Sequence, residues 1–289
     1  MGLVHGHEFR PPKQSRIKRF LLYLYGRLEP TILRMFNKLL SSKFFTKNRV
    51  GRAMIKLIAK MMWFLPYGVV LPYPLVEEIF EEFQKHSRIR AGRCPCKLVY
   101  AEMYGRDKVE DFDLRTDINF FAGLSASEAY EKKHHSDYID VDMEWLRKHF
   151  ELFAKKGLVP TIYACCRSGQ WMFVLCNCDK RYCVPLRAYL VWGEGVTKSP
   201  FYVEADKAKC VECGKCIRIC PADANISPGE VDPEKCIGCG ICIYHCEGNA
   251  RRLVVREKYK LPRHAKILKP FIKHFVEEHL KQPIPRWLR

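Results

Sequence analysis

The sequence predicts an α+β fold with a helical N-terminal region, a small cysteine-bearing α+β domain, a compact cysteine-rich module and a C-terminal helix. Apolar residues recur at helical spacing near both ends of the 289-residue chain. Between them, a helical pattern that ends at Gly157 is followed at once by two short β-type segments. Of the 15 cysteines, eight lie between Cys210 and Cys246. These observations divide the chain into four predicted segments, 1–73, 74–200, 201–256 and 257–289.

The positive charge belongs to the two ends of the chain. Residues 1–60 hold 14 Lys and Arg against two Asp and Glu, a net charge of +12, and residues 251–289 hold 12 against three, a net charge of +9. Residues 61–250 carry a net charge of −3. Basic ends indicate either a solvated surface or attraction to an acidic redox partner or an anionic membrane surface. Nucleic acid is not expected as a partner, because no motif would place a reading element in a groove.

The cysteine content bears on the redox compartment. Fifteen cysteines would suit a secreted disulfide framework. However, charged residues and histidines interrupt residues 1–10, and no apolar segment of the signal-peptide type follows. A cytoplasmic protein is therefore expected, either free or peripheral on the inner face of the membrane.

Residues 1–73 are predicted to form a basic amphipathic helical arm. One helix is expected over 16–29, a second from Pro30 and a third from about Val50, because the residue before a proline avoids helical backbone angles. The uncharged run from Met61 to Val76 is shorter than the ~20 apolar residues of a spanning helix, and prolines divide it. Four aromatic residues of this region suit a membrane interface, the protein's own core or a partner subunit: Trp63, Phe64, Tyr67 and Tyr73.

The α+β domain is predicted over 74–200. Pro74 opens a helix with one apolar stripe, expected to end at Ala91-Gly92. A second helix, 143–156, is capped by Asp142. A hairpin with strands from Leu158 to Ala164 and from Trp171 to Leu175 follows it. Between the two helices lies an acidic stretch with paired histidines, His134-His135, a type of pair that is more often solvated than metal-bound.

The cysteines of the module repeat one spacing. The first run, from Cys210 to Pro221, reads C-x2-C-x2-C-x3-C-P, and the second, from Cys236 to Cys246, reads C-x2-C-x2-C-x3-C. Thiolates two residues apart on a tight loop converge on one soft metal centre, and glycines let the backbone approach it. Disulfides and zinc are the alternatives, but zinc sites use two separated pairs rather than a triplet followed by Cys-Pro.

This stretch resembles the bacterial two-cluster ferredoxin module, over about residues 203–256. In that pattern the fourth cysteine of each run ligates the other cluster. The resemblance therefore implies a first [4Fe–4S] cluster on Cys210, Cys213, Cys216 and Cys246, and a second on Cys236, Cys239, Cys242 and Cys220. Glu247 stands where the family usually repeats a proline, which removes no ligand but alters the turn and the charge beside the first cluster.

Seven cysteines lie outside this module. Cys165-Cys166 and Cys176-Asn177-Cys178 flank the hairpin, Cys183 follows, and Pro95 fixes the backbone of Cys94-Pro95-Cys96. A four-thiolate site drawn from them is expected to hold a third iron–sulfur cluster or zinc. A redox-active cysteine pair and free buried thiols are the alternatives.

The order of these features is similar to that of uncharacterised ferredoxin-fused iron–sulfur proteins of anaerobes. That wider resemblance implies a third iron–sulfur centre on Cys96, Cys176, Cys178 and Cys183, with Cys94 as the alternate ligand.

The motifs together predict an iron–sulfur electron-transfer protein, which relays electrons through two [4Fe–4S] clusters to a partner or to the upstream centre. The alternative is an oxidoreductase whose upstream cysteine domain reduces a small substrate with electrons from the module. An open iron position near Asp117, His134 or His135 would mark such an enzyme, and its catalytic residues are not otherwise defined. An iron–sulfur sensor that binds nucleic acid ranks last. Residues 257–289 are predicted to form a basic amphipathic helix, divided by Pro270.

Overall fold

The computed structural model describes residues 15–61, 67–85, 88–121, 137–165 and 171–289. A seven-stranded sheet stands at its centre, in the order β4-β2-β3-β6-β5-β1-β7. Neighbouring strands are antiparallel, except that β1 and β7 are parallel. The strands are β1 (Gly68–Val70), β2 (Arg88–Gly92), β3 (Asp117–Phe121), β4 (Ile139–Val141), β5 (Val159–Cys165), β6 (Trp171–Cys178) and β7 (Val196–Thr197). This mixed architecture agrees with the predicted α+β class.

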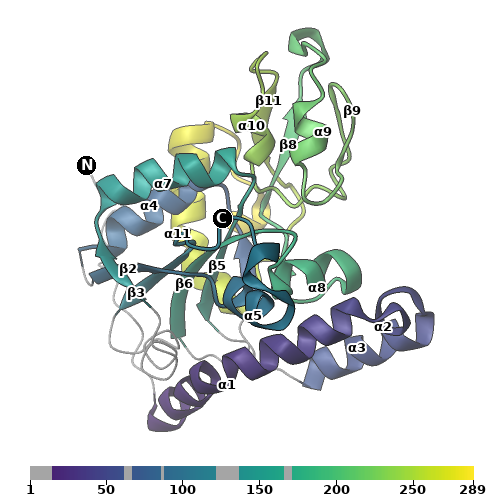
Figure 1. Ribbon diagram of the computed structural model, residues 1–289. Coiled ribbons are helices and arrows are strands. Elements are labelled where there is room, and N and C mark those ends of the chain that lie inside the picture. The colour runs from purple at the N-terminus through teal and green to yellow at the C-terminus, as the bar shows by residue number, and fades with distance from the viewer. Residues whose placement is uncertain (1–14, 62–66, 86–87, 122–136, 166–170) are drawn as a thin grey trace.

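Helices cover both faces of the sheet (Figure 1). One hydrophobic core joins the sheet to α4 (Tyr73–Phe83), α7 (Met143–Lys155) and α11 (Lys269–Phe275). A second core joins the opposite face to α1 (Arg16–Ser41), α3 (Arg49–Met61), α5 (Pro95–Tyr104) and α8 (Val184–Trp192). Because successive strand residues point to opposite faces, Leu175 of β6 joins the first core, while its neighbour Val174 joins the second.

The predicted break at Pro30 is wrong. Helix α1 runs through this proline, and α2 (Lys43–Lys47) and α3 follow it. A proline ring inside a helix meets the carbonyl four residues earlier, and here that residue is glycine, whose backbone adapts most easily. Continuity also lets one face of α1 pack against α5 and α8 along its length. That buried face has helical spacing on both sides of the proline: Gly26, Pro30, Leu33, Asn37 and Leu40.

For Tyr73, the structure selects the protein's own core from the alternatives left open, because this residue is 1% exposed and its hydroxyl lies within hydrogen-bonding distance of the Leu158 carbonyl and of Asn177 Oδ1. Trp63 and Phe64 lie outside the described residues. Helix α4 ends at Phe83, and Ala91-Gly92 belongs to β2 rather than to a helix end.

The helix–hairpin prediction is confirmed. Asp142 caps α7 by accepting a hydrogen bond from the Trp145 amide at 2.8 Å. Gly157 follows with φ +73°. Strands β5 and β6 then pair antiparallel, with Val159 opposite Cys178 and Thr161 opposite Cys176.

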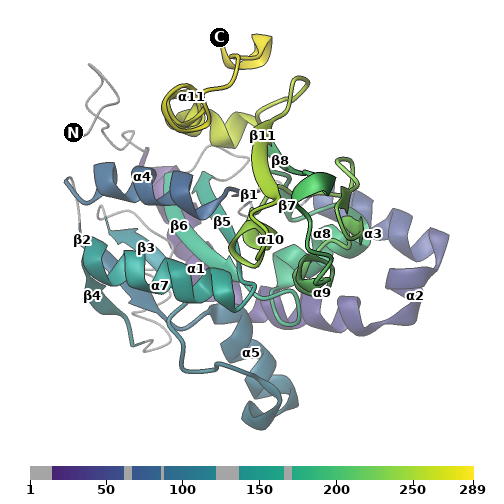
Figure 2. The same cartoon turned by 90° about the horizontal axis from the view of Figure 1, so that it is seen from above.

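The module and the tail follow. In the module, β8 (Phe201–Ala205) pairs antiparallel with β11 (Arg251–Val255), and β9 (Asn225–Ser227) with β10 (Glu230–Val231). The short helices α9 (Lys215–Ile219) and α10 (Ile241–Tyr244) follow the two cysteine loops, and α10 lies beside α7 (Figure 2). Short 3₁₀ turns are η1 (Arg106–Lys108) and η2 (Lys207–Lys209).

The tail is divided next to Pro270, as predicted, but its parts are helices of different types rather than two halves of one helix. The structure changes from a 3₁₀ helix to an α-helix at Lys269, so Pro270 occupies the first turn of α11, where no amide is needed. A π-helix and a last 3₁₀ turn follow. These elements are η3 (Arg263–Leu268), η4 (Val276–Leu280) and η5 (Arg286–Leu288).

The hydrophobic cores cross the predicted segment boundaries. The first core contains Tyr73, Cys216 and Phe275, which come from the first, third and fourth segments. The second contains Leu33, Cys96 and Cys239. Within the described residues, no helix combines the length and the apolarity that crossing a membrane requires.

Candidate metal centres

Each cysteine run of the module wraps around a glycine with positive φ. Gly214 (φ +67°) and Gly240 (φ +74°) precede α9 and α10, which carry the third cysteine of their runs. Gly238 (φ +71°) has no room for a side chain, since a Cβ there would lie 2.1 Å from the Phe201 carbonyl oxygen. The close approach of the second loop to β8 therefore requires glycine.

The cysteines predicted for the first cluster lie toward the surface. Cys210, Cys213 and Cys246 are partly exposed, and Cys216 is buried. Two donors point at their sulfurs: Arg251 Nη2 lies 2.9 Å from Cys216 Sγ, and the Ala250 amide lies 3.2 Å from Cys246 Sγ. Hydrogen bonds of this kind stabilise thiolates. They suit a metal–sulfur cluster.

Glu247 forms an ion pair with Lys215, and this contact lowers the pKa of Glu247. The charge of Glu247 beside the cysteines predicted for the first cluster is therefore compensated.

The cysteines predicted for the second cluster are all buried. Cys220, Cys236, Cys239 and Cys242 together line a small pocket. The Ala224 amide donates to Cys220 Sγ at 3.3 Å. Burial raises the pKa of the Cys242 thiol to about 12 and that of the Cys239 thiol well above its usual value. Metal ions supply the charge that deprotonates such thiols, so the residues present fit an iron–sulfur cluster.

Residues 202–247 match the family model of the 4Fe-4S dicluster domain. The chain therefore contains an iron–sulfur, ferredoxin-like module that binds [4Fe–4S] cluster cofactor. This finding supports a role in electron transfer. Neither a search of curated proteins nor a search of solved structures found a match.

Five cysteines of the upstream domain lie on the face of the sheet that α5 and α8 cover. Cys176 and Cys178 are two residues apart on β6 and so share this face. Cys94 and Cys96 stand at the start of α5, and Cys183 caps the start of α8. Each helix has a proline in its first turn, which begins it abruptly beside the sulfurs.

The thiols of four of these cysteines influence one another's pKa in sequence: Cys94 interacts with Cys96, Cys96 with Cys183, and Cys183 with Cys178. All four are buried.

Hydrogen bonds from neighbouring thiols and burial raise the pKa of Cys94 and of Cys96 well above the usual value of a thiol. Burial is the main cause for Cys183. A cation at the centre of this group would lower the pKa of these thiols and so offset both the burial and the interactions between the thiols. The donor set thus fits a thiolate-bound metal or cluster.

The fifth cysteine has a different partner. Cys176 Sγ donates to Asp117 Oδ1 at 3.2 Å, and Asp117 also accepts from Asn119 Nδ2 at 2.9 Å and from the Tyr138 hydroxyl. Burial raises the pKa of Asp117. The enzyme alternative would place an open iron position near Asp117, His134 or His135; the structure places Asp117 beside Cys176, and the two histidines lie outside the described residues.

The hairpin register separates Cys165 from the other cysteines. Cys165 stands opposite Trp171, at the far end of the hairpin from Cys178. Cys166 lies outside the described residues.

Sequence reasoning missed three residues of these sites. Burial raises the pKa of Tyr73 well above its ordinary value, and the charges of Tyr244, of Cys178 on β6 and of Cys239 in the module add to this effect, so its hydroxyl is near a cysteine of each group. Arg251, only 7% exposed, reaches the Cys216 sulfur from β11. Lys97, only 2% exposed, bonds the carbonyls of Glu110 and Asp111 beside Cys94. Each lies outside the cysteine motifs, so no spacing rule points to it.

Proposed function

We propose that this protein relays electrons between two [4Fe–4S] clusters in the module and a third, cysteine-ligated centre in the upstream domain. The first cluster has the ligands Cys210, Cys213, Cys216 and Cys246, and the second has Cys220, Cys236, Cys239 and Cys242. The position of Tyr73 carries this proposal. Its hydroxyl is buried, and both Cys239, a proposed ligand of the second cluster, and Cys178 of the upstream domain act electrostatically on it, so this hydroxyl is near a cysteine of each centre.

For the third centre we propose the ligands Cys94, Cys96, Cys178 and Cys183. The resemblance placed Cys176 in this set and kept Cys94 as the alternate. Two observations support the exchange: each of these four thiols influences the pKa of the next in the order Cys94, Cys96, Cys183 and Cys178, whereas Cys176 donates to Asp117.

The sulfur spacing favours iron–sulfur over zinc at this centre. A tetrahedral zinc site with Zn–S bonds near 2.3 Å requires sulfurs about 3.8 Å apart along every edge. Among the described residues, no three cysteines have all of their sulfurs within 4.8 Å of one another. A cubane, whose four irons stand at separate corners, holds its thiolates farther apart. The module cysteines show the same wide spacing.

Metal analysis of single variants tests this assignment. Anaerobically purified protein should contain about 12 irons per chain, as expected for three cubanes. Cys94→Ser and Cys178→Ser should each contain about eight irons, because the module keeps its two clusters. Cys176→Ser should keep the wild-type content, as should Cys165→Ser, a control at the other end of the hairpin.

Three results would contradict the assignment. About eight irons in the wild-type protein would remove the third centre. Loss of iron in Cys176→Ser, but not in Cys94→Ser, would restore the ligand set that the sequence implied. Zinc in place of the additional irons would make the third centre structural rather than redox-active.

We also propose that α1 to α3 dock on an anionic membrane surface. One face of this layer packs on the protein, through contacts such as Arg187 Nη1 to Asn37 Oδ1 at 2.7 Å and Trp192 Nε1 to the Phe45 carbonyl at 2.8 Å. Residues 16–60 contain 12 Lys and Arg and one Glu. Large apolar side chains nevertheless remain exposed along the layer: Ile17, Phe20, Leu24, Leu28, Met35, Phe44, Val50, Met54 and Leu57.

Exposed apolar side chains among basic residues suit the interface of an anionic bilayer. The layer runs along one side of the molecule, away from the module (Figure 1). Full-length protein should float with vesicles that contain anionic lipid, and Phe20→Glu with Leu24→Glu should abolish flotation. Phe20→Leu is the matched control. Wild-type protein that stays unbound at low salt would leave an acidic partner protein as the target of this surface.

A reductase is the second candidate function, and the Cys176–Asp117 pair favours it. With Cys94 as a ligand, this partly buried thiol and the buried carboxyl border the third centre without completing it. They would be suited to hold a proton for a substrate reduced there. Substrate-dependent oxidation of the reduced protein, lost in Asp117→Asn with its iron content intact, would support this function.

A further inference from the structure

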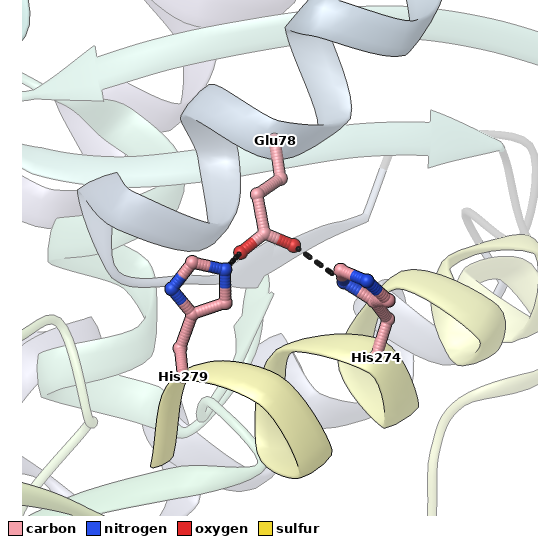
Figure 3. A group of neighbouring side chains, drawn as sticks. All are labelled: Glu78, His274 and His279. Carbon is pink, nitrogen blue, oxygen red and sulfur yellow. Dashed lines mark hydrogen bonds and ion pairs between the residues drawn. The ribbon is translucent and has the colours of Figure 1, made fainter. Parts of the chain in front are cut away.

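The C-terminal tail meets α4 at a group of three side chains that the iron–sulfur centres do not use. Glu78 extends from α4, His274 from α11 and His279 from the π-helix η4. Figure 3 shows both imidazole rings turned toward the one carboxylate. Glu78 Oε2 lies 3.3 Å from His274 Nδ1, and Glu78 Oε1 lies 2.8 Å from His279 Nε2.

The ligand atoms have the spacing of a single metal site. All of them lie within 4.8 Å of one another. Zinc bonds of about 2.0–2.2 Å to His nitrogen and carboxylate oxygen place tetrahedral ligands about 3.4 Å apart. The two measured distances, 2.8 and 3.3 Å, are close to that edge. Two histidines and one glutamate are also a known catalytic zinc set, in which the fourth position stays open to water.

The local backbone brings the two histidines together. In an α-helix, residues five apart differ by about 140° around the axis, so they face different sides. Here the chain passes from α11 into η4, whose wider turn carries residues five apart toward the same side. The π-helix ends at Lys281 in the left-handed region, φ +50°. Such π-helical turns are rare and occur often at functional sites.

The surroundings favour a cation. Glu77 and Glu81 flank Glu78 on α4, and Arg147 pairs with both of them. Glu78 Oε1 is buried and faces His279 Nε2 without the alignment of a hydrogen bond. A buried carboxylate oxygen that lacks a hydrogen bond is costly, and coordination to a metal ion would satisfy it. His279 is about half exposed, which leaves a path for an ion to enter.

We propose that Glu78, His274 and His279 bind one divalent first-row transition-metal ion, with zinc as the test ion. The ion would join the tail to α4 and thus the fourth predicted segment to the second. This site is separate from the iron–sulfur centres, since its ligands are nitrogen and oxygen and it shares no residue with them.

Zinc analysis of the full-length protein tests the proposal. Protein with its clusters intact is dialysed against zinc and then analysed for zinc, iron and sulfide, with X-ray absorption at the zinc edge. One zinc per chain with nitrogen and oxygen ligands is expected. His279→Ala and Glu78→Gln should each weaken zinc binding by at least about tenfold, with iron and sulfide unchanged. His149→Ala, a histidine on α7 stacked on Trp145, should bind zinc as the wild type does.

Two outcomes would overturn the proposal. The first is a wild-type protein that retains no zinc after dialysis. The second is zinc with sulfur ligands that is lost in Cys96→Ser and kept in His279→Ala, which would place the ion in the upstream cysteine group. Iron is measured in the same samples, so a general loss of clusters can be distinguished from a specific loss of zinc. In the described residues, His279 and Glu78 are not among the residues that contact the cysteines.

Discussion

Arg251 should raise the reduction potential of the first cluster, and Arg251→Gln should lower it. The guanidinium is buried, with Nη2 at 2.9 Å from Cys216 Sγ and Nη1 at 2.5 Å from Asn225 Oδ1. Reduction adds one negative charge to the cluster, and a nearby positive charge stabilises the reduced state. Arg251 also acts on Cys242, a proposed ligand of the second cluster, so both clusters should respond.

The magnitude follows from the separation of the charges. The added electron spreads over the cluster beyond the sulfur, so about 6 Å is a reasonable effective distance, and at an effective dielectric constant of about 20 the attraction is about 3 kcal/mol. For one electron, about 59 mV corresponds to about 1.4 kcal/mol. The potential should therefore fall by up to about 120 mV, and less where solvent screens the pair.

Potentiometric titration followed by electron paramagnetic resonance measures the shift. Arg251→Lys is the matched control, because it keeps the charge while losing the bidentate geometry, and it should shift the potential by less than half as much. Iron content must equal that of the wild type in both variants. An unchanged or higher potential in Arg251→Gln would refute the electrostatic role of this residue.

Two other substitutions test the path between the centres and the stability of the fold. Tyr73→Phe removes a hydroxyl buried near Cys178 and Cys239. The substitution should lower the free energy of unfolding by about 1 kcal/mol. It should also slow electron transfer from the module to the proposed third centre in flash-reduction experiments. Tyr244→Phe, on the more exposed side of the same ring pair, is its control, and equal rates in the two variants would contradict a bridging role. Asp142→Ala removes the cap of α7 and should lower the free energy of unfolding by about 1 kcal/mol in denaturant titrations. Asp142→Asn should lower it by less. An Asp142→Ala variant as stable as the wild type would show that solvent replaces the cap.

Local patterns were read correctly where local forces decide. The cap at Asp142, the apolar stripe of α4 and the β5–β6 hairpin all depend on residues within a few positions of one another. The helix break expected at Pro30 does not occur, because a longer-range effect outweighs the local preference of proline. The buried face of α1 continues across the proline, and packing against α5 and α8 stabilises the unbroken helix.

The upstream group of cysteines shows what spacing rules cannot predict. Its cysteines are separated by more than 80 residues, from Cys94 to Cys178 and Cys183, and no local rule says which of them meet. The sheet register decides this, because it turns Cys176 and Cys178 to the face where α5 and α8 begin. The same holds for Glu78, which meets His274 and His279 only because the tail packs on α4.

The sequence by itself determined the chemistry of the module, because the ligands of a cubane lie close together on short loops and their spacing is written directly in the chain. The tertiary structure alone decided what surrounds that module: the buried charge of Arg251, the ring of Tyr73 and the second group of thiols. These groups come from distant strands and helices, and they meet only when two cores form on opposite faces of one sheet.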